Sequence, residues 1–520
     1  MRPLLYLSPF LFASIAASTA IAGGVAANTG LEDLAARIGE ENLPTGAGVE
    51  MGQVEAANTS GDYGPDTTHA NFPDKTFNMM SGATGVLNHA TTVGFRAYGT
   101  SQVGIAPGID TIYCYNAEDW LLYSYLRVAS SSAIPPYEPP GEVAIFNDSW
   151  VATFGDDTYD KIALRRADWA VGTDDVMMIN GMPNSGDPFP LMVYMFNGVS
   201  VGVDGGSHVS DPVPAPFDGA GRQIPLIVGP QNSTSNATGV VSAATALLIE
   251  TARTHPNTSG NFFSTLSETL KATLLTGGVH EIGWTNNPPK GGADRGRTSQ
   301  PIDDIYGVGS VNIDRSWQVM TGGQHGGDSS PIGMPVAPYA AWDVASLLNG
   351  GSKYYKFNTQ DMSDEVSILL TWHQNVNTGF GSYSMANLDL QLWGLDESEN
   401  LVALTGNAGI GVFGSGNVVS ESDVDNVEHL YIRDLAPGEY ALEVSRNDSA
   451  GSTRVFAVAW LFPEPSGGVP GDINGDGVVN VNDLLALISA WGPCSGDCPA
   501  DINGDGTVNV QDLLELLSLW

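Results

Sequence analysis

The feature that most constrains the fold is a twelve-residue loop that occurs twice near the C-terminal end of the chain. Residues 472–483 recur as residues 501–512, with oxygen-bearing side chains at positions 1, 3, 5, 9 and 12 and glycine at position 6. Calcium prefers several hard oxygen ligands, and this spacing wraps them around one ion, with a backbone carbonyl at position 7. The sequence therefore predicts two Ca²⁺ sites, with ligands from Asp472, Asn474, Asp476, Val478, Asn480 and Asp483 and from Asp501, Asn503, Asp505, Thr507, Asn509 and Asp512.

Each loop runs into an amphipathic helix. Apolar residues recur at i, i+3, i+4 and i+7 in both copies: Val481, Leu484, Leu485 and Ile488, then Val510, Leu513, Leu514 and Leu517. The order loop, single helix, linker, loop, single helix over residues 471–520 resembles a type I dockerin, which also has Asp at position 12. The resemblance implies a small α-helical, calcium-dependent module with paired EF-hand-like loops. It also implies a cohesin-bearing scaffold or cell-surface protein as partner.

The part of the chain up to residue 322 alternates between strand-like and helix-like segments. Strand-like runs include 49–54, 142–147 and 176–179, and helix-like runs include 160–171, 237–254 and 263–275. This alternation predicts an α/β domain over residues 23–322 with a mostly parallel sheet.

Three segments of this domain together resemble the subtilisin family, and a further one supports the resemblance. An opening strand ends in Glu55, Asn-His-Ala-Thr-Thr-Val-Gly contains His89, and Ser-Thr-Ser-Asn-Ala-Thr-Gly contains Ser235 at the start of a helix. The order acid, histidine, serine is the subtilisin order. Residues 176–186 resemble the strand and turn that carry the oxyanion-hole asparagine, which is Asn184 here.

The resemblance implies a serine endopeptidase that acts on peptide or protein substrates. A serine hydroxyl is a weak nucleophile until a base takes its proton, so Ser235 needs His89. A buried carboxylate, Glu55, fixes the imidazole tautomer, and the Asn184 amide with the Ser235 backbone N–H stabilises the tetrahedral oxyanion.

Several residues depart from the family pattern and leave alternatives open. Glu55 stands where the family has Asp, Ser233 where it has Gly, Asn236 where it has Met, and Gly239 where it has Pro. A catalytically impaired surface protein with the same fold, which binds peptide or has a structural role, is therefore an alternative. A non-protease hydrolase or lectin is a third.

Between the two domains the helical periodicity stops. Short alternating runs between residues 339 and 463 predict an all-β, jelly-roll-like sandwich, which resembles the domain that follows the catalytic domain in some bacterial subtilases. Gly/Pro-rich residues 323–338 and 464–470 read as linkers. The sandwich either stabilises the catalytic unit, binds calcium or serves as a passive spacer.

Composition and the N-terminal segment predict where the protein acts. Residues 1–22 have a basic residue, an apolar run and a small-residue cleavage site, which is typical of a signal peptide and indicates secretion to the cell surface or medium. No later stretch is apolar enough to span a membrane. The net charge of −38 argues against nucleic-acid binding. Cys494 and Cys498 are close enough in sequence for a small disulfide, which leaves Cys114 as a buried apolar residue.

Overall fold

The structure is a computed structural model that describes residues 6–7, 28–186, 189–448, 451–463, 471, 473, 479, 481–494, 498–503 and 506–519. Apart from β1 (Tyr6–Leu7), which pairs with β6 (Ala152–Thr153), the predicted signal peptide lies outside the described residues. The predicted linker at residues 464–470 lies outside them as well.

The first domain is built on a seven-stranded sheet in which every neighbouring pair is parallel. The strand order is β3 (Thr76–Met79), β4 (Thr111–Asn116), β2 (Glu50–Glu55), β5 (Val143–Asp148), β7 (Met177–Gly181), β8 (Val199–Val203) and β9 (Ile227–Gly229). This confirms the prediction of an α/β domain with a mostly parallel sheet. The predicted strands 49–54, 142–147 and 176–179 correspond to β2, β5 and β7.

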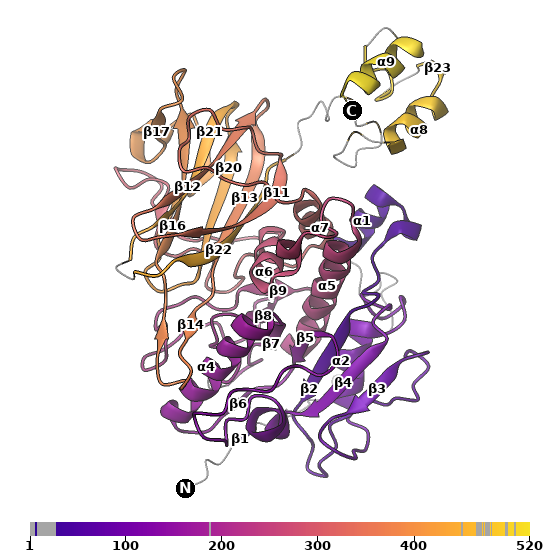
Figure 1. Cartoon of the computed structure of the whole chain (residues 1–520), viewed down its shortest axis with the longest axis vertical. Coiled ribbons are helices and arrows are strands. Elements are labelled where there is room, and N and C mark those ends of the chain that lie inside the picture. The colour runs from indigo at the N-terminus through magenta and orange to yellow at the C-terminus, as the bar shows by residue number, and fades with distance from the viewer. Residues whose placement is uncertain are drawn as a thin grey trace.

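Helices cover both faces of this sheet (Figure 1). Alternate residues of the strands enter two separate cores: Ile145 lies in one and Phe146 in the other. One core contains α1 (Leu31–Ile38), α2 (Asn88–Tyr98), α5 (Thr234–Thr254), α6 (Ser267–Thr276) and α7 (Ile313–Thr321). The second contains α3 (Ala117–Asp119), η2 (Trp120–Ser124) and α4 (Asp157–Asp174). Strands buried on both faces are what a parallel sheet requires.

The second domain consists of two packed sheets with mostly antiparallel pairing. One has the order β11 (Ala340–Leu347), β22 (Arg454–Leu461), β13 (Ser363–Thr371), β20 (Val427–Leu435) and β18 (Ser415–Gly416). The other has the order β10 (Arg297–Thr298), β19 (Val419–Ser420), β16 (Leu388–Leu395), β21 (Gly438–Arg446) and β12 (Ser352–Thr359), with β17 (Leu401–Ala403) also paired to β16. A buried apolar cluster lies between them. A short hairpin, β14 (Asn375–Val376) and β15 (Tyr383–Ser384), extends from this domain.

The sandwich packs directly on the helices of the first domain. Trp342 of β11 is fully buried in the same core as α6 and α7, and its indole N–H donates to the carbonyl of Met320 at 3.0 Å. Leu369, Val427, Ala457, Ala459 and Leu461 contribute to that core as well. Residues 323–338 run along the sandwich, where isolated bridges join them to β11 and β12.

Buried polar groups also join the two domains. Gln374 Nε2 donates to Asp168 of α4 at 3.0 Å, and the backbone carbonyl of Gln374 accepts from the side-chain amide of Asn197 at 3.1 Å. Asn426 donates to the carbonyl of Phe196 at 3.0 Å. Because buried polar groups are costly to leave unpaired, these bonds couple the two domains energetically.

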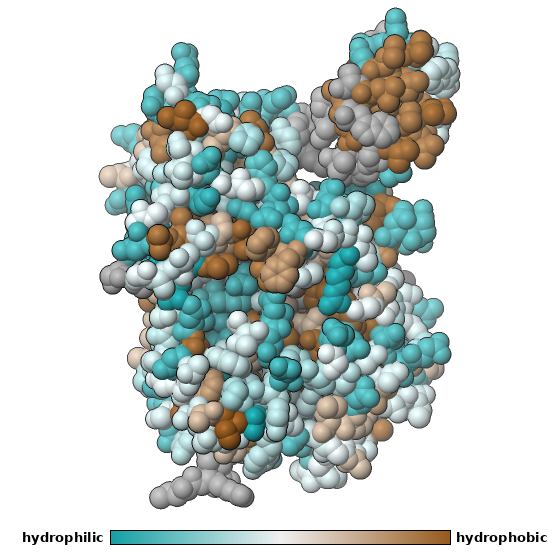
Figure 2. All heavy atoms as spheres, in the orientation of Figure 1, coloured by the Kyte–Doolittle hydropathy of each residue, from teal (hydrophilic) through white to brown (hydrophobic). Residues whose placement is uncertain are grey.

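The C-terminal module has two short helices, α8 (Val481–Ser489) and α9 (Val510–Leu519). A two-stranded pairing of β23 (Gly492–Pro493) with β24 (Thr507–Val508) and a Cys494–Cys498 disulfide lie between them in sequence. Leu487 and Leu516 are buried in its small core, whereas three equivalent pairs of the two helices are exposed: Val481 and Val510, Leu485 and Leu514, Ile488 and Leu517. Figure 2 shows this module with a largely hydrophobic surface.

Among the described residues, no helix has both the length and the apolar character needed to cross a membrane.

Candidate active site and calcium-binding loops

The first turn of α5 carries the predicted nucleophile. Ser233 is the N-cap, and its side-chain oxygen accepts from the backbone N–H of Asn236 at 3.4 Å. Ser235 is the second residue of the helix and is only 5% exposed. The first N–H groups of a helix have no acceptor within the helix and lie at the positive end of its dipole. This turn is therefore suited to stabilise a negative charge next to Ser235.

Asn184 follows β7 and contacts the same turn. Its Oδ1 accepts from the backbone N–H of Thr234 at 3.0 Å. Because this bond involves Oδ1, the two hydrogens on Nδ2 lie on the other side of the Asn184 amide group. Hydrogen-bond donors beside a nucleophilic serine are what an oxyanion hole requires.

A network of buried side chains fixes α5 against the end of β5. Ser149 Oγ donates to the carbonyl of Ser235 at 3.1 Å and accepts from Asn147 Nδ2 at 2.9 Å. Ser242 Oγ donates to Asn147 Oδ1 at 3.0 Å. The Asn-x-Ser sequence that ends β5 therefore orients the nucleophile-bearing turn.

Glu55 and His89 form a direct pair. Glu55 is the last residue of β2 and is 1% exposed, and His89 is the second residue of α2. His89 Nδ1 lies 2.6 Å from Glu55 Oε2. Burial by itself lowers the pKa of His89, but the negative charge of Glu55 and the hydrogen bond to it outweigh burial and raise that pKa above its ordinary value of 6.5.

The second carboxylate oxygen of Glu55 has a partner that the sequence interpretation missed. Gln53 Nε2 donates to Glu55 Oε1 at 2.9 Å. The signal was present in the sequence, because residues two apart on a strand point to the same face. Gln53 was therefore a predictable neighbour of Glu55.

A close approach of two helices brings the histidine and the serine turn together. A Cβ at Gly239 of α5 would lie 3.0 Å from the carbonyl oxygen of Val93 and 3.2 Å from Cβ of Arg96, both in α2. The glycine at this position therefore lets α5 pack tightly on α2. Their N-terminal turns line one small pocket of about 100 Å³, formed by Asn88, His89, Thr92, Ser233 and Asn236.

A second buried carboxyl group lies near Glu55, at Asp148 of β5. Burial raises the pKa of Asp148 to about 8; the indole N–H of Trp150, which donates to Oδ1 at 3.0 Å, opposes this shift, and the charge of Glu55 adds to it. Its Oδ2 has no hydrogen-bond partner in the described part of the chain. At neutral pH Asp148 is protonated and adds no negative charge beside Glu55.

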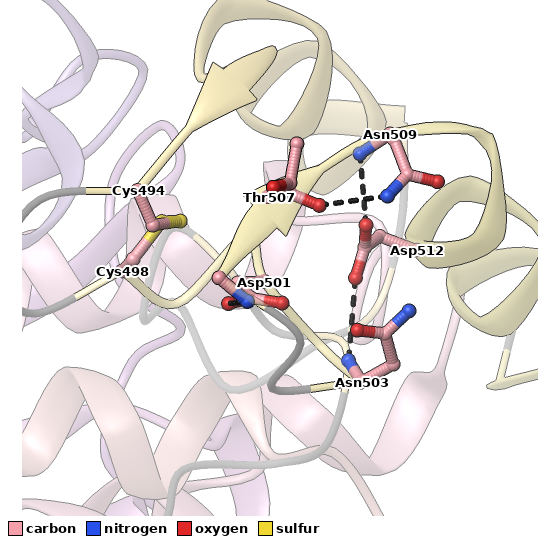
Figure 3. The surroundings of a disulfide bond; sticks show 8 residues. Cys494, Cys498, Asp501, Asn503, Thr507, Asn509 and Asp512 are labelled. Carbon is pink, nitrogen blue, oxygen red and sulfur yellow. Dashed lines mark hydrogen bonds between the residues drawn. A yellow bond between two sulfur atoms is a disulfide. The ribbon is translucent and has the colours of Figure 1, made fainter.

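The second predicted calcium loop is held by hydrogen bonds between its carboxylates and its backbone. Asp512 accepts from the backbone N–H of Asn503 at 3.2 Å and of Asn509 at 2.8 Å, so one carboxylate closes the loop from both sides. Asp501 Oδ2 accepts from Gly506 N–H at 2.7 Å. Figure 3 shows these side chains, with Thr507, beside the Cys494–Cys498 disulfide. Carboxylate and amide oxygens at one loop fit the preference of Ca²⁺.

The first loop is described only in part. Asp483 Oδ1 accepts from the backbone N–H of Ile473 at 2.8 Å, much as Asp512 closes the second loop. The other ligands predicted there, and one in the second loop, lie outside the described residues: Asp472, Asn474, Asp476, Val478, Asn480 and Asp505.

Comparison with known proteins identifies the C-terminal module. Residues 470–518 match the model of the dockerin type I domain, which confirms the dockerin predicted at 471–520. No curated protein matches the chain in sequence.

Three solved structures show partial similarity to the chain. The prenylagaramide maturation protease PagA is 19% identical, with 56% of this chain and 98% of that chain covered and a TM-score of 0.36. MycP1 from Mycobacterium smegmatis is 13% identical, with 55% and 83% covered and a TM-score of 0.32. Tripeptidyl peptidase 2 is 8% identical, with 72% and 40% covered and a TM-score of 0.29.

Proposed function

We propose that residues 23–322 form a subtilisin-like serine endopeptidase that hydrolyses peptide bonds with Glu55, His89 and Ser235. The observation that carries this proposal is the buried Glu55–His89 pair at 2.6 Å, whose histidine shares a pocket with the first turn of α5. A sheet in which all pairs are parallel, with the histidine and serine helices packed together on one face, supports the subtilisin type.

Each residue has a separate role in this mechanism. Nδ1–H of His89 donates to Glu55, so Nε2 is free of a proton and takes the one from Ser235 Oγ as that oxygen attacks the substrate carbonyl. The Asn184 amide and the backbone N–H of Ser235 stabilise the oxyanion. His89 then returns the proton to the leaving amine, and water releases the acyl group by the same steps in reverse order.

Labelling with a fluorophosphonate probe tests this proposal. The full chain should react at Ser235, Ser235→Ala should abolish labelling, and Glu55→Ala should slow it strongly. A folded, calcium-loaded protein that is not labelled would refute the activity. It would favour the alternative of a catalytically impaired protein that binds peptide in the same cleft.

The dockerin match supports a second element of the proposal, which is calcium-dependent anchoring. Ca²⁺ is held by the two loops, and the module docks onto a cohesin-bearing scaffold or cell-surface protein. The exposed apolar residues of α8 and α9, such as Leu485 and Leu514, supply the surface that such a partner would cover. A signal peptide at residues 1–22 brings the enzyme to the outside of the cell, where peptide or protein substrates and calcium are available.

Binding of the full chain to an immobilised type I cohesin, with calcium and with chelator, tests the anchoring. Leu485→Asp with Leu514→Asp should abolish capture, whereas the same change at Leu348, an exposed residue of the sandwich domain, should not. Equal capture by both variants would refute this assignment of the docking surface.

The domain organisation is part of the same proposal. It has a jelly-roll-like sandwich at residues 339–463, with linkers at residues 323–338 and 464–470.

A further inference from the structure

We propose that Gln53 and Tyr98 are positioning residues that hold the Glu55 carboxylate in register with His89. The inference rests on the proposed endopeptidase function and adds two residues to its machinery. Neither touches the reacting atoms, so both act through Glu55.

The geometry of β2 places Gln53 beside Glu55. Gln53 and Glu55 are two residues apart, so their side chains leave the same face of the strand, the one covered by α2. Both are 1% exposed. Gln53 Nε2 donates to Glu55 Oε1 at 2.9 Å, while Glu55 Oε2 pairs with His89 at 2.6 Å. The carboxylate is therefore held by one partner at each oxygen.

Hydrogen bonds fix the orientation of the Gln53 amide. Nε2 has two hydrogens, and both are used: one on Glu55, the other on the carbonyl of Ala90 at 2.9 Å. Oε1 accepts from the hydroxyl of Tyr98 at 2.5 Å. A flipped amide would place its oxygen against two acceptors and its nitrogen against a donor. Glu55, the Ala90 carbonyl and Tyr98 therefore together determine which end of the amide faces Glu55.

Helix α2 carries both His89 and Tyr98. Tyr98 is the last residue of the helix and is fully buried. A Cβ at Gly94, one turn earlier, would clash with the Tyr98 hydroxyl, so the glycine makes the close passage of this side chain possible. The helix is thus attached to β2 near both ends, through His89 at its start and Tyr98 at its end.

The bond from Gln53 also suits a glutamate at position 55. A longer side chain has an additional rotatable bond, and a carboxylate bound only to His89 would sample several positions. Gln53 removes that freedom by binding the other oxygen. The sequence pattern Gln-Val-Glu at the end of β2 and the tyrosine at the end of α2 therefore form one functional unit with Glu55.

Three variants of the full, calcium-loaded chain test the proposal through steady-state peptide hydrolysis. Gln53→Leu should lower kcat roughly 10²-fold, because displacing a catalytic group by about 1 Å costs that much. Tyr98→Phe should lower kcat about tenfold, because the Gln53 amide is retained but loses the hydrogen bond that holds its Oε1. KM should remain within about twofold in both. Tyr440→Phe is the matched control, since this tyrosine is also buried and donates to the Ala436 carbonyl at 2.7 Å in the sandwich.

Gln53→Glu gives a readout that a purely structural role would not change. The new carboxyl group has the same shape and can donate to Glu55 only while it is protonated. Two adjacent buried carboxyl groups share one proton, which leaves as pH rises. The single O–H of the new carboxyl group cannot serve both Glu55 and the Ala90 carbonyl, so at each acid pH the variant should retain most, but not all, of the wild-type kcat/KM. As pH rises it should lose activity on an added alkaline limb, which the wild type lacks.

The outcomes separate this inference from the function on which it rests. Unchanged kcat in folded Gln53→Leu and Tyr98→Phe, or no alkaline limb in Gln53→Glu, would overturn the positioning role while leaving the protease intact. Failure of the wild type to react with fluorophosphonate would overturn the proposed function. In that event the low-field proton NMR signal of His89 Nδ1–H still tests the geometry. It should be present in the wild type and lost in Gln53→Leu, and its persistence in that variant would overturn the positioning role.

Discussion

Replacing Glu55 by Asp tests how closely the carboxylate is matched to its two partners. The change removes one methylene and retracts the oxygens by about 1.5 Å. The distance to His89 would grow from 2.6 Å to roughly 4 Å, beyond the range of a hydrogen bond. The contact with Gln53 would lengthen in the same way. The backbone cannot follow, because β2 is hydrogen-bonded to β4 on one side and to β5 on the other.

The expected decrease in kcat depends on whether a variant keeps the negative charge or the length of the Glu55 side chain. Loss of the orienting carboxylate in such triads costs about 10⁴ in kcat. Glu55→Asp keeps the negative charge near His89, so we expect a decrease of about 10²–10³, or about 2.7–4 kcal/mol in activation free energy. Glu55→Gln keeps the length but substitutes an amide, and we expect the full decrease of about 10³–10⁴, because the His89 tautomer is no longer fixed.

The assay is the second-order rate constant for fluorophosphonate labelling, with peptide turnover measured in parallel. Thermal unfolding of each variant controls for loss of structure. If Glu55→Asp labels within about threefold of the wild-type rate, the pair has room to readjust and the argument from distances is wrong. If Glu55→Asp is impaired more than Glu55→Gln, the length of the side chain matters more than its charge, and the expected order of the two variants is wrong.

Three further predictions concern pH, calcium and the domain interface. Because the pKa of His89 is raised, the acid limb of kcat/KM should lie above pH 6.5, and activity should increase as pH rises through that limb. The same raised pKa contributes folding stability below pH 6.5, and this contribution is lost as pH rises through the pKa of the folded state. An acid limb below pH 6.5 would contradict the Glu55–His89 coupling. Chelation of calcium should make residues 471–519 sensitive to protease while residues 50–461 stay resistant, because the acidic loops repel each other without the ion; unchanged resistance of both parts would contradict a calcium-dependent fold. Trp342→Ala should lower the free energy of unfolding by about 3–5 kcal/mol in denaturant titration, since it leaves a cavity in the core shared by both domains; a change below about 1 kcal/mol would mean that the interface contributes little.

Sequence patterns were sufficient for the elements whose signal is local. The strand–helix alternation predicted the parallel sheet, and the order of loops and helices at the C-terminal end, by its resemblance to type I dockerins, predicted the dockerin. The Glu55–His89 contact joins two segments that only a family resemblance could relate in advance. In each case the residues themselves carry the information, either through periodicity or through a motif.

The remaining features depend on which surfaces meet, and periodicity does not encode that. Strand periodicity places Gln53 beside Glu55, but its bonds to Ala90 and Tyr98 form only because α2 covers that face of β2. Trp342 reads as a residue of a sandwich core, yet its indole is buried against α7 of the other domain. The short strand β10, at residues 297–298, pairs with the sandwich although it lies within the segment predicted as the peptidase. A sequence shows that a face is apolar, but not what covers it.

The core shared by the sandwich and helices α6 and α7 bears on how such a gene can be rearranged. A recombination breakpoint between α7 and β11 would separate residues that bury one another, and both products would expose apolar surface to water. A breakpoint after residue 463 would instead separate the α/β domain and sandwich together from the dockerin and its own core. We therefore expect that recombination can exchange the dockerin more readily than the sandwich, which shares its core with the α/β domain.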